Sequence, residues 1–249
     1  MKELIAKLNE IRFDETKEME ALCLLREVSS TSVIVESPEY IYELTSVVKD
    51  MCGENEDFVV FDKVLNKIVE ASTEYEGKNV DIYCDFLDQA IELLVYKLVE
   101  LSELDITDEE LLFELYTRLN ACYPNNKAPS YWVSIIEGYA NCAISLGKEK
   151  LDNSLLNLGL SQFQRVLTLY KADGFPDYWR IENMVASTKL GLVSASMDCY
   201  KINKREFATV FQYAESLLNE ALDTFLESGT DFNIEYTEQL LREYAENKG

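Results

Sequence analysis

Apolar residues recur at helical spacing along most of the chain, and the clearest stretch follows residue 129. Its apolar positions fall at offsets of 3, 4, 7, 8, 11 and 14 residues, so they lie on one face of a helix. Ser130 is the expected N-cap of this helix, and Gly147 is expected where the helix ends. The apolar positions are Trp132, Ile135, Ile136, Tyr139, Ala140, Ala143 and Leu146.

The tetrapeptide PSYW at 129–132 returns as PDYW at 176–179, a step of 47 residues. In each copy the proline turns the chain, and a helix is expected to begin at the aromatic residues, which pack against neighbouring helices. Each of these helices is followed by a second amphipathic helix. The spacing therefore predicts two helical hairpins with the same architecture.

The second helix of the later hairpin has recognisable start and stop signals. Asn203 and Glu206 are predicted to form a capping box, in which the side chain of each residue accepts a hydrogen bond from the backbone N–H of the other. One apolar stripe then runs from Phe207 to Phe225, and Gly229 ends the helix. A short amphipathic helix from about residue 232 closes the chain.

Further helices are expected upstream. Ser37 and Pro38 offer an N-cap followed by proline at the first helical position, and Thr107 with Glu110 offers another capping box. The segment 30–37 is rich in β-branched residues and is the one place where a short strand is expected. The expected helices span residues 2–12, 15–28, 38–52, 58–76, 79–103 and 108–122.

These patterns predict an all-α fold of about eleven helices, stacked as antiparallel hairpins in a solenoid-like array or in an irregular helical bundle. The chain contains only 9 Gly and 4 Pro, which suits long helices better than a β-sandwich with its many turns. We expect a single all-helical domain over 1–249, with an acidic N-terminal half at 1–125 and the hairpin repeats at 126–249.

Residues 112–228 resemble a tetratricopeptide-type helical repeat. Trp132 and Tyr139 are seven residues apart, as the Trp and Tyr of that family are, and the resemblance implies an architecture of stacked hairpins. The period of 47 residues is longer than the family's 34. Departures from the family pattern also occur at four marked positions, which are Ile136, Glu182, Asn183 and Ala186.

The composition removes several classes of catalytic site. Histidine is absent, which excludes Ser-His-Asp and Cys-His nucleophilic sites and histidine-ligated metals. The six cysteines lack any C-x-x-C or zinc spacing and are expected to be structural thiols. No apolar run approaches the roughly 18 residues of a membrane span, and the start of the chain lacks a signal-peptide core. We therefore expect a cytoplasmic protein that is not an enzyme and binds no cofactor or metal.

The net charge is −23, and it is unevenly distributed. Residues 1–125 hold 29 acids and 11 bases, whereas residues 126–249 hold 17 acids and 12 bases. Within 50–114 there are 19 acids and 4 bases. A field this negative repels nucleic acids and anionic membranes, so we expect no direct binding to either. It favours a basic protein partner.

One predicted helix concentrates this charge. Asp81, Asp85, Asp88 and Glu92 are spaced by 4, 3 and 4 residues, so the sequence places four carboxylates on one helix face. Three interpretations remain open: a solvated stripe on a mostly buried helix, a docking stripe for a basic surface, or ligands for Mg²⁺. The other candidate partner-binding residues are Asp105, Asp108, Glu109, Tyr131 and Tyr178.

The sequence favours a non-enzymatic binding protein. Its acidity and its lack of catalytic motifs match small inhibitors or neutralisers, of the immunity or counter-defence type, that mask a basic or nucleic-acid-binding protein. One alternative is a scaffold or regulatory subunit that binds a peptide in a helical-repeat groove. Another is a carboxylate-dependent metalloenzyme, which would need the acidic row to converge with other acids. The oligomeric state is left open.

Overall fold

The computed structural model describes residues 2–11, 14–30, 40–55, 58–101, 105–122, 129–172, 174–176 and 180–248. These residues form helices joined by short connections, and no strand occurs among them, which confirms the predicted all-α class. The chain divides into two compact units, Met1–Pro124 and Asn125–Gly249. The division falls where the sequence changes from its acidic half to its hairpin half. That the two units form a single domain stays a prediction.

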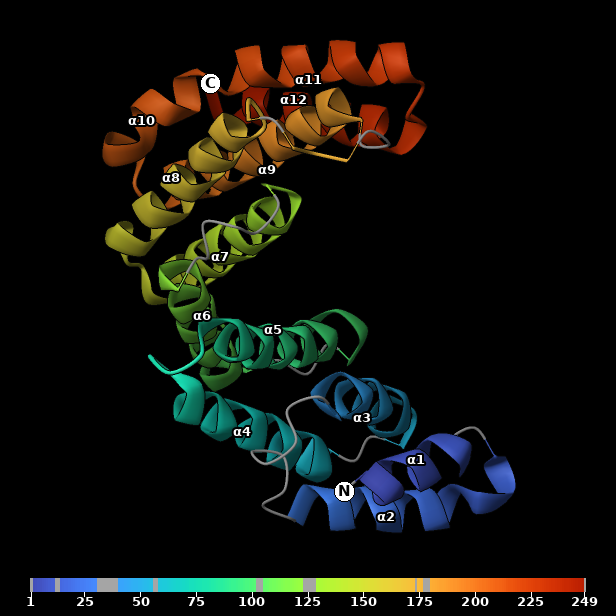
Figure 1. Cartoon of the computed structure of the whole chain (residues 1–249). Helices are drawn as coiled ribbons and strands as arrows, with labels where there is room; N and C mark the ends of the chain where they lie inside the picture. Colours follow the sequence, from blue (N-terminus) through green and yellow to red (C-terminus); the bar gives the residue numbers. More distant parts are fainter. Residues whose placement is uncertain are drawn as a thin grey trace. The chain divides into compact units, whose positions relative to one another are not determined.

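Unit 1, Met1–Pro124, is built from helices that run side by side (Figure 1). Helix α5 lies at its centre and packs against α3, α4 and α6. The reason is its composition, because nine of its side chains, among them Tyr83, Phe86 and Leu94, are buried. The described helices are α1 (Lys2–Ile11), α2 (Glu18–Ser30), α3 (Ile41–Asn55), α4 (Phe58–Tyr75), α5 (Val80–Tyr96) and α6 (Ile106–Ala121), with a 3₁₀ turn at Glu15–Lys17 and a π-helical segment at Lys97–Leu101.

Two helix starts predicted in unit 1 are not seen in the described structure. The expected cap at Ser37 and Pro38, and the expected strand after Ser30, lie outside the described residues, while Ser30 itself ends α2. The predicted capping box of Thr107 and Glu110 is wrong. Helix α6 begins two residues earlier, and its capping box joins Asp105 to Asp108. Aspartate is as good an N-cap as threonine, so both positions offered a plausible start.

Unit 2, Asn125–Gly249, consists of hairpins in chain order (Figure 1). Its helices are α7 (Pro129–Lys150), α8 (Asn153–Leu169), α9 (Ile181–Ile202), α10 (Lys204–Gln212), α11 (Ala214–Ser228) and α12 (Asp231–Lys248). Over the described part of the chain there are twelve α-helices rather than about eleven, because the helix predicted from Asn203 is interrupted at Tyr213. Its buried stripe nevertheless continues across the interruption, from Phe207 through Phe211 and Ala214 to Phe225.

The caps of unit 2 divide into confirmed and wrong predictions. Asn203 caps α10 by accepting a hydrogen bond from the backbone N–H of Glu206, but the predicted box is not closed, because the backbone N–H of Asn203 donates to the carbonyl oxygen of Cys199. Gly229 ends α11 in the left-handed conformation, with φ of 69°. Ser130 is not an N-cap, because the helix already includes Pro129. Gly147 does not end α7 either. It is buried inside the helix, which continues to Lys150.

The role of glycine in the first hairpin is close packing. A Cβ atom on Gly159 of α8 would lie 2.6 Å from Cγ1 of Ile144 and 2.8 Å from the carbonyl oxygen of Ala140, both on α7. A Cβ atom on Gly147 would lie 2.8 Å from Leu156 in the same way. The two helices therefore approach more closely than any larger residue would allow. The sequence pattern predicted that Gly147 ends the helix, because such a pattern carries no information on the distance between helices.

Helix α9 connects the layers of unit 2. Its residues take part in three buried clusters: one with α7 and the end of α8, one with α7, α8 and α10, and one with α10, α11 and α12. The aromatic anchors behave unequally, since Tyr139 is buried whereas Trp132 keeps part of its surface exposed. Throughout the part of the chain that the structure describes, no helix is long and apolar enough to cross a membrane.

Candidate functional site

The predicted acidic row lies on α5 beside helix α3. Asp81 and Glu92 are exposed, and Asp85 and Asp88 are partly exposed. Lys49 of α3 forms an ion pair with Glu92, which also accepts a hydrogen bond of 3.1 Å from the side chain of Gln89. The like charges of the row are thus partly compensated by a cation from the neighbouring helix.

Tyr42, also on α3, faces the same row. Burial and then the charge and hydrogen bond of Asp85 raise the pKa of the Tyr42 phenol to about 12, with smaller contributions from Asp88 and Glu92. Three of the four predicted residues therefore contribute to the raised pKa of one tyrosine. The row serves as a contact between α3 and α5 as well as a source of negative field.

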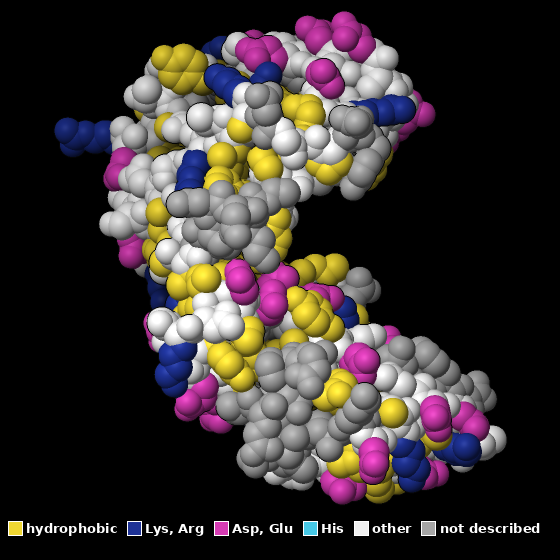
Figure 2. Space-filling view, viewed as in Figure 1, with side chains coloured by type: hydrophobic (Ala, Val, Ile, Leu, Met, Phe, Trp, Pro, Cys, Tyr) yellow, Lys and Arg dark blue, Asp and Glu magenta, His cyan; other side chains and the backbone are white. Residues whose placement is uncertain are grey.

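The acidic side chains of unit 1 do not gather into one metal site. Figure 2 shows Asp and Glu side chains scattered among hydrophobic and polar ones over the visible face of this unit. Among the described residues, no group of three or more Cys, Asp and Glu side chains is arranged to hold a metal ion. No observation in this part of the chain favours the magnesium interpretation of the row.

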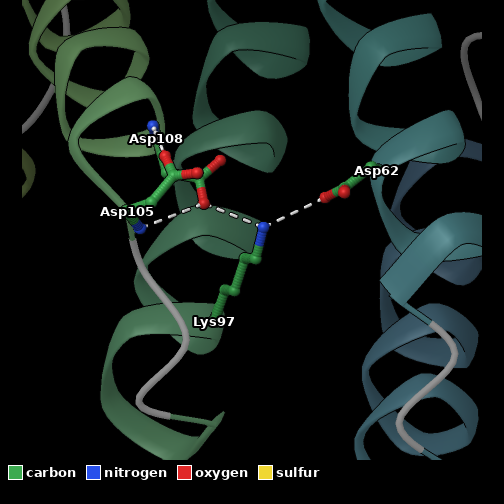
Figure 3. Close-up of polar contacts among 4 residues, drawn as sticks. All are labelled: Asp62, Lys97, Asp105 and Asp108. Carbon is green, nitrogen blue, oxygen red and sulfur yellow. Dashed lines mark hydrogen bonds and ion pairs between the residues drawn. The ribbon is translucent and has the colours of Figure 1, made fainter.

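Two further predicted residues, Asp105 and Asp108, cap α6. The backbone N–H of Asp108 donates to Oδ1 of Asp105 at 2.9 Å, and the N–H of Asp105 donates to Oδ2 of Asp108 at 3.5 Å. The same Oδ2 of Asp108 accepts a hydrogen bond of 2.8 Å from Nζ of Lys97 (Figure 3). Glu109, the remaining predicted acid, is partly exposed on α6.

Lys97 is the residue of this cluster that the sequence prediction missed. It begins the π-helical segment after α5, is 7% exposed, and also donates to Asp62 of α4 at 3.1 Å (Figure 3). Burial lowers the pKa of the Lys97 ammonium, but the hydrogen bonds and charges of Asp108 and Asp62 outweigh burial and raise the pKa above its ordinary value. A signal was present in the sequence, since a lysine inside the apolar stretch LLVYKLVEL needs an acidic partner.

The two predicted tyrosines are not brought together by the described structure. Tyr131 lies partly exposed in the first turn of α7, where its carbonyl oxygen accepts a hydrogen bond of 2.9 Å from Ser134. Tyr178 lies outside the described residues. Nothing in the structure therefore links them as one surface.

The described cysteines are free thiols in environments that differ in exposure. Cys84 and Cys199 are buried, and burial raises the pKa of the Cys199 thiol to about 12. Burial and the charge of Glu76 also raise the pKa of Cys122. Since the thiolate is the nucleophilic form, these shifts disfavour reactivity at neutral pH for Cys122 and Cys199.

Unit 2 contains a groove of about 500 Å³ that is lined by α7, α9 and α12. The floor on α9 is made of small residues, including Ser187, Gly191 and Ser194, while Phe232 of α12 stands at the rim with 77% of its surface exposed. The remaining lining residues are Asn141, Ile144, Ser145, Lys148, Leu190, Ala195, Asp198, Asn233 and Tyr236.

One end of the groove contains an ion pair between α7 and α9. Nζ of Lys148 lies 2.6 Å from Oδ2 of Asp198, and Lys201 lies 3.7 Å from the other oxygen of the same carboxylate. The rest of the lining consists mainly of hydroxyl and amide side chains with two aromatic rings. The sequence prediction missed this groove, although small residues four and three positions apart at 187, 191 and 194 mark a helix face with room beside it.

Comparison with known proteins gives only a likeness of fold. No protein-family model matches the chain, and no curated protein matches it. Among solved structures, the de novo designed helical repeat protein DHR64 is similar at 16% identity and a TM-score of 0.33, over 86% of this chain and 94% of that one.

Two further solved structures are also similar. The DHF58 filament matches at 16% identity and a TM-score of 0.28, over 88% of this chain and 95% of that one. A chain from the computational design of self-assembling cyclic homo-oligomers matches at 11% identity and a TM-score of 0.21, over 99% of this chain and 90% of that one. TM-scores at this level carry no argument about function.

Proposed function

We propose that this chain is a non-enzymatic binding protein that takes a peptide segment of a protein partner into the groove between α7, α9 and α12. The observation that carries the proposal is the groove itself. Its volume of about 500 Å³ lies within the range of roughly 300–1,000 Å³ that is usual for ligand sites. A groove between α7, α9 and α12 suits a chain segment better than a compact small molecule.

The chemistry of the lining supports a peptide as the ligand. Asn141 and Asn233 carry amides that can donate to and accept from a peptide backbone at once. Phe232 and Tyr236 offer apolar surface to a ligand side chain, and the small residues of α9 allow a backbone to approach closely. Few polar groups with fixed positions and some exposed aromatic surface are typical of recognition sites.

The arrangement of the groove agrees with the tetratricopeptide-like pattern in the sequence. Helices α7 and α9 are the first helices of successive hairpins, and α12 follows them in chain order. Repeats of helical hairpins present extended surfaces of this kind for protein recognition. The resemblance in Trp132 and Tyr139 thus supports, on independent grounds, a role in binding proteins.

A second candidate function is neutralisation of a basic or nucleic-acid-binding protein by unit 1. Its support is the excess of 29 acids over 11 bases, together with the four carboxylates of the α5 row, of which Glu92 pairs with Lys49. Such a field accelerates the encounter with a positively charged surface. The two functions are compatible, because steering by one unit would assist peptide capture by the other.

The groove proposal can be tested by filling the groove. Ser194→Trp places a large side chain on its floor, and Ser161→Trp places the same side chain on an exposed position of α8 outside it. We expect affinity capture from the native host, followed by mass spectrometry, to recover the same partner with wild type and Ser161→Trp and to lose it with Ser194→Trp. Recovery of that partner by both variants would reject the groove as the site.

A further inference from the structure

A polar cluster lies at the α7–α9 seam, one helical turn beyond the groove. Glu137 precedes the groove residue Asn141 by four positions on α7, and Thr188 follows the groove residue Ser187 on α9. The hydroxyl of Thr188 donates to Oε1 of Glu137 at 2.5 Å. Helical geometry therefore places this carboxylate on the same side of α7 as the groove.

The carboxylate of Glu137 is mostly buried but has few partners. Its only hydrogen bond among the described residues is the one from Thr188, although a carboxylate offers about four acceptor positions. No lysine or arginine of the described chain forms an ion pair with it, and the lysines Lys148 and Lys189 pair with Asp198 and Glu220 instead. Burial accordingly raises the pKa of the Glu137 carboxyl.

A second acceptor in the same cluster is also unused. The Tyr170 hydroxyl at the end of α8 is fully enclosed, the residue is 6% exposed, and the oxygen has no hydrogen-bond partner in the described structure. Burial and then the charge of Glu137 raise the pKa of the Tyr170 phenol to about 12, and the nearby Thr188 hydroxyl lowers it by a smaller amount. Val133, Ile136 and Val166 surround it with apolar surface.

A buried polar atom without a hydrogen-bond partner lowers the stability of the folded protein. A native domain therefore contains only a few such atoms. A group with several N–H donors and a positive charge would satisfy both oxygen-bearing side chains and compensate the carboxylate. An ammonium has three donors and a guanidinium has five, whereas a neutral hydroxyl or amide supplies fewer and leaves the charge uncompensated.

We infer that Glu137, Thr188 and Tyr170 form a subsite for the charged end of a lysine or arginine side chain on the peptide that occupies the groove. This inference rests on the proposed function of the groove and names the chemistry of its ligand. Glu137 supplies the charge and the open acceptor positions, Thr188 fixes the carboxylate by its hydrogen bond, and the enclosed Tyr170 hydroxyl offers a further acceptor.

The test is a selection from a randomised peptide library displayed on phage, with the full-length protein as bait. Three baits are compared: wild type, Glu137→Gln, and Glu149→Gln. Glutamine at 137 keeps an acceptor for Thr188 but removes the charge. Glu149 is exposed on the same helix, so its variant matches the change in net charge. Thermal melts establish that all three baits are folded.

We expect wild type and Glu149→Gln to enrich peptides with a lysine or arginine at a fixed distance from an apolar residue. Glu137→Gln should enrich peptides without that preference. A selected peptide should bind Glu137→Gln about tenfold more weakly than wild type, as the loss of a charge-assisted hydrogen bond implies.

The other outcomes separate the two proposals. If all three baits select the same peptides and Ser194→Trp binds none of them, the groove stands and the basic subsite is rejected. If no peptide is enriched, or if Ser194→Trp binds the selected peptides as wild type does, the proposed function fails and the subsite fails with it. If free spermidine binds wild type and not Glu137→Gln while the peptides show no basic preference, the cation comes from a polyamine and the peptide assignment is overturned.

Discussion

Units 1 and 2 differ in how a buried charge is compensated. In unit 1 the ammonium of Lys97 lies 3.1 Å from Asp62 and 2.8 Å from Asp108, so one buried cation has two carboxylates. In unit 2 the mostly buried carboxylate of Glu137 has one hydroxyl donor and no cation within the described chain. The first arrangement is complete without a ligand, whereas the second is not.

This difference separates structural charges from candidate functional ones. A buried ion pair leaves an uncompensated charge when one member is removed, so its role shows in stability. A mostly buried charge without a compensating cation weakens the free protein, which makes it a candidate for ligand binding.

Replacing Lys97 with methionine should destabilise unit 1 by about 3 kcal/mol, because Asp108 is left partly buried beside an apolar side chain. Asp62 is half exposed and can turn toward water, which keeps the loss at the lower end of the range for buried pairs. Urea denaturation followed by circular dichroism measures the change. Lys63→Met, an exposed position on α4, is the matched control and should change stability by less than about 0.5 kcal/mol.

Replacing Gly159 with alanine should destabilise unit 2 by about 1 kcal/mol. The added Cβ would press against the carbonyl oxygen of Ala140, which is backbone and cannot turn away. Overpacking of this kind costs about 1–3 kcal/mol, and the gain of about 1 kcal/mol in helix propensity offsets only part of it. Ser161→Ala, exposed on the same helix, should show no loss. A more stable Gly159→Ala protein would mean that α7 and α8 are not in close contact.

The Lys97 cluster should also give unit 1 a sensitivity to alkaline pH. The pKa of Lys97 is raised in the folded state, so its contribution to stability is complete below the ordinary lysine pKa of about 10.4 and is lost as pH rises through the higher folded value. The difference in unfolding free energy between wild type and Lys97→Met should therefore be constant at neutral pH and shrink at strongly alkaline pH. A difference that persists unchanged would show that packing, not charge, is responsible.

Glu137→Gln should have the opposite sign, and it should be smaller. Burial raises the folded pKa of Glu137, so the stability that its neutral form confers is present below the ordinary glutamate pKa of about 4.3 and is lost as pH rises through the folded value. The variant should melt at a higher temperature than wild type at pH 7 and at the same temperature near pH 4. A lower melting temperature at pH 7 would mean that the charge of Glu137 stabilises the free protein.

The sequence predicted the helices well because apolar positions with a period of 3.6 residues are a local signal. The stripe from Phe207 to Phe225 was correct even though the helix breaks at Tyr213, where no proline or glycine announces the break. Gly147 and Thr107 were misjudged for a different reason. Both residue types fit a helix end, and only the packing partner or the neighbouring aspartate decides the outcome.

The candidate sites were harder to predict because they depend on contacts between distant helices. Asp105 and Asp108 were selected for their charge, but Lys97, the partner of Asp108, could be identified only when the segment after α5 and helix α6 were placed together. Glu137 stands between Ile136 and Tyr139 in the sequence, and its lack of a cation is a property of α7, α8 and α9 combined. The groove likewise is formed by three helices, so the sequence pattern of any one helix does not predict it.

The smallest expected effect concerns the excess of acid in unit 1. Replacing Asp81, Asp85 and Asp88 with Asn, while keeping Glu92 as the partner of Lys49, should change stability by no more than about 0.5 kcal/mol, because mutual repulsion on α5 is relieved. The association rate with a basic partner should fall about threefold at low salt, and the wild-type rate should fall with added salt, since steering is screened over about 8–10 Å at physiological ionic strength.

The matched control neutralises three exposed acids of unit 2, Asp223, Glu227 and Glu246, which carry the same charge in a nearly balanced region. Stopped-flow association with the captured partner compares the two triple variants with wild type. A slower rate for the α5 variant alone would locate the steering field on unit 1. Equal losses would assign the effect to net charge, and unchanged rates in both would leave the row as a solvated stripe whose contacts with Tyr42 and Lys49 serve only to hold α3 against α5.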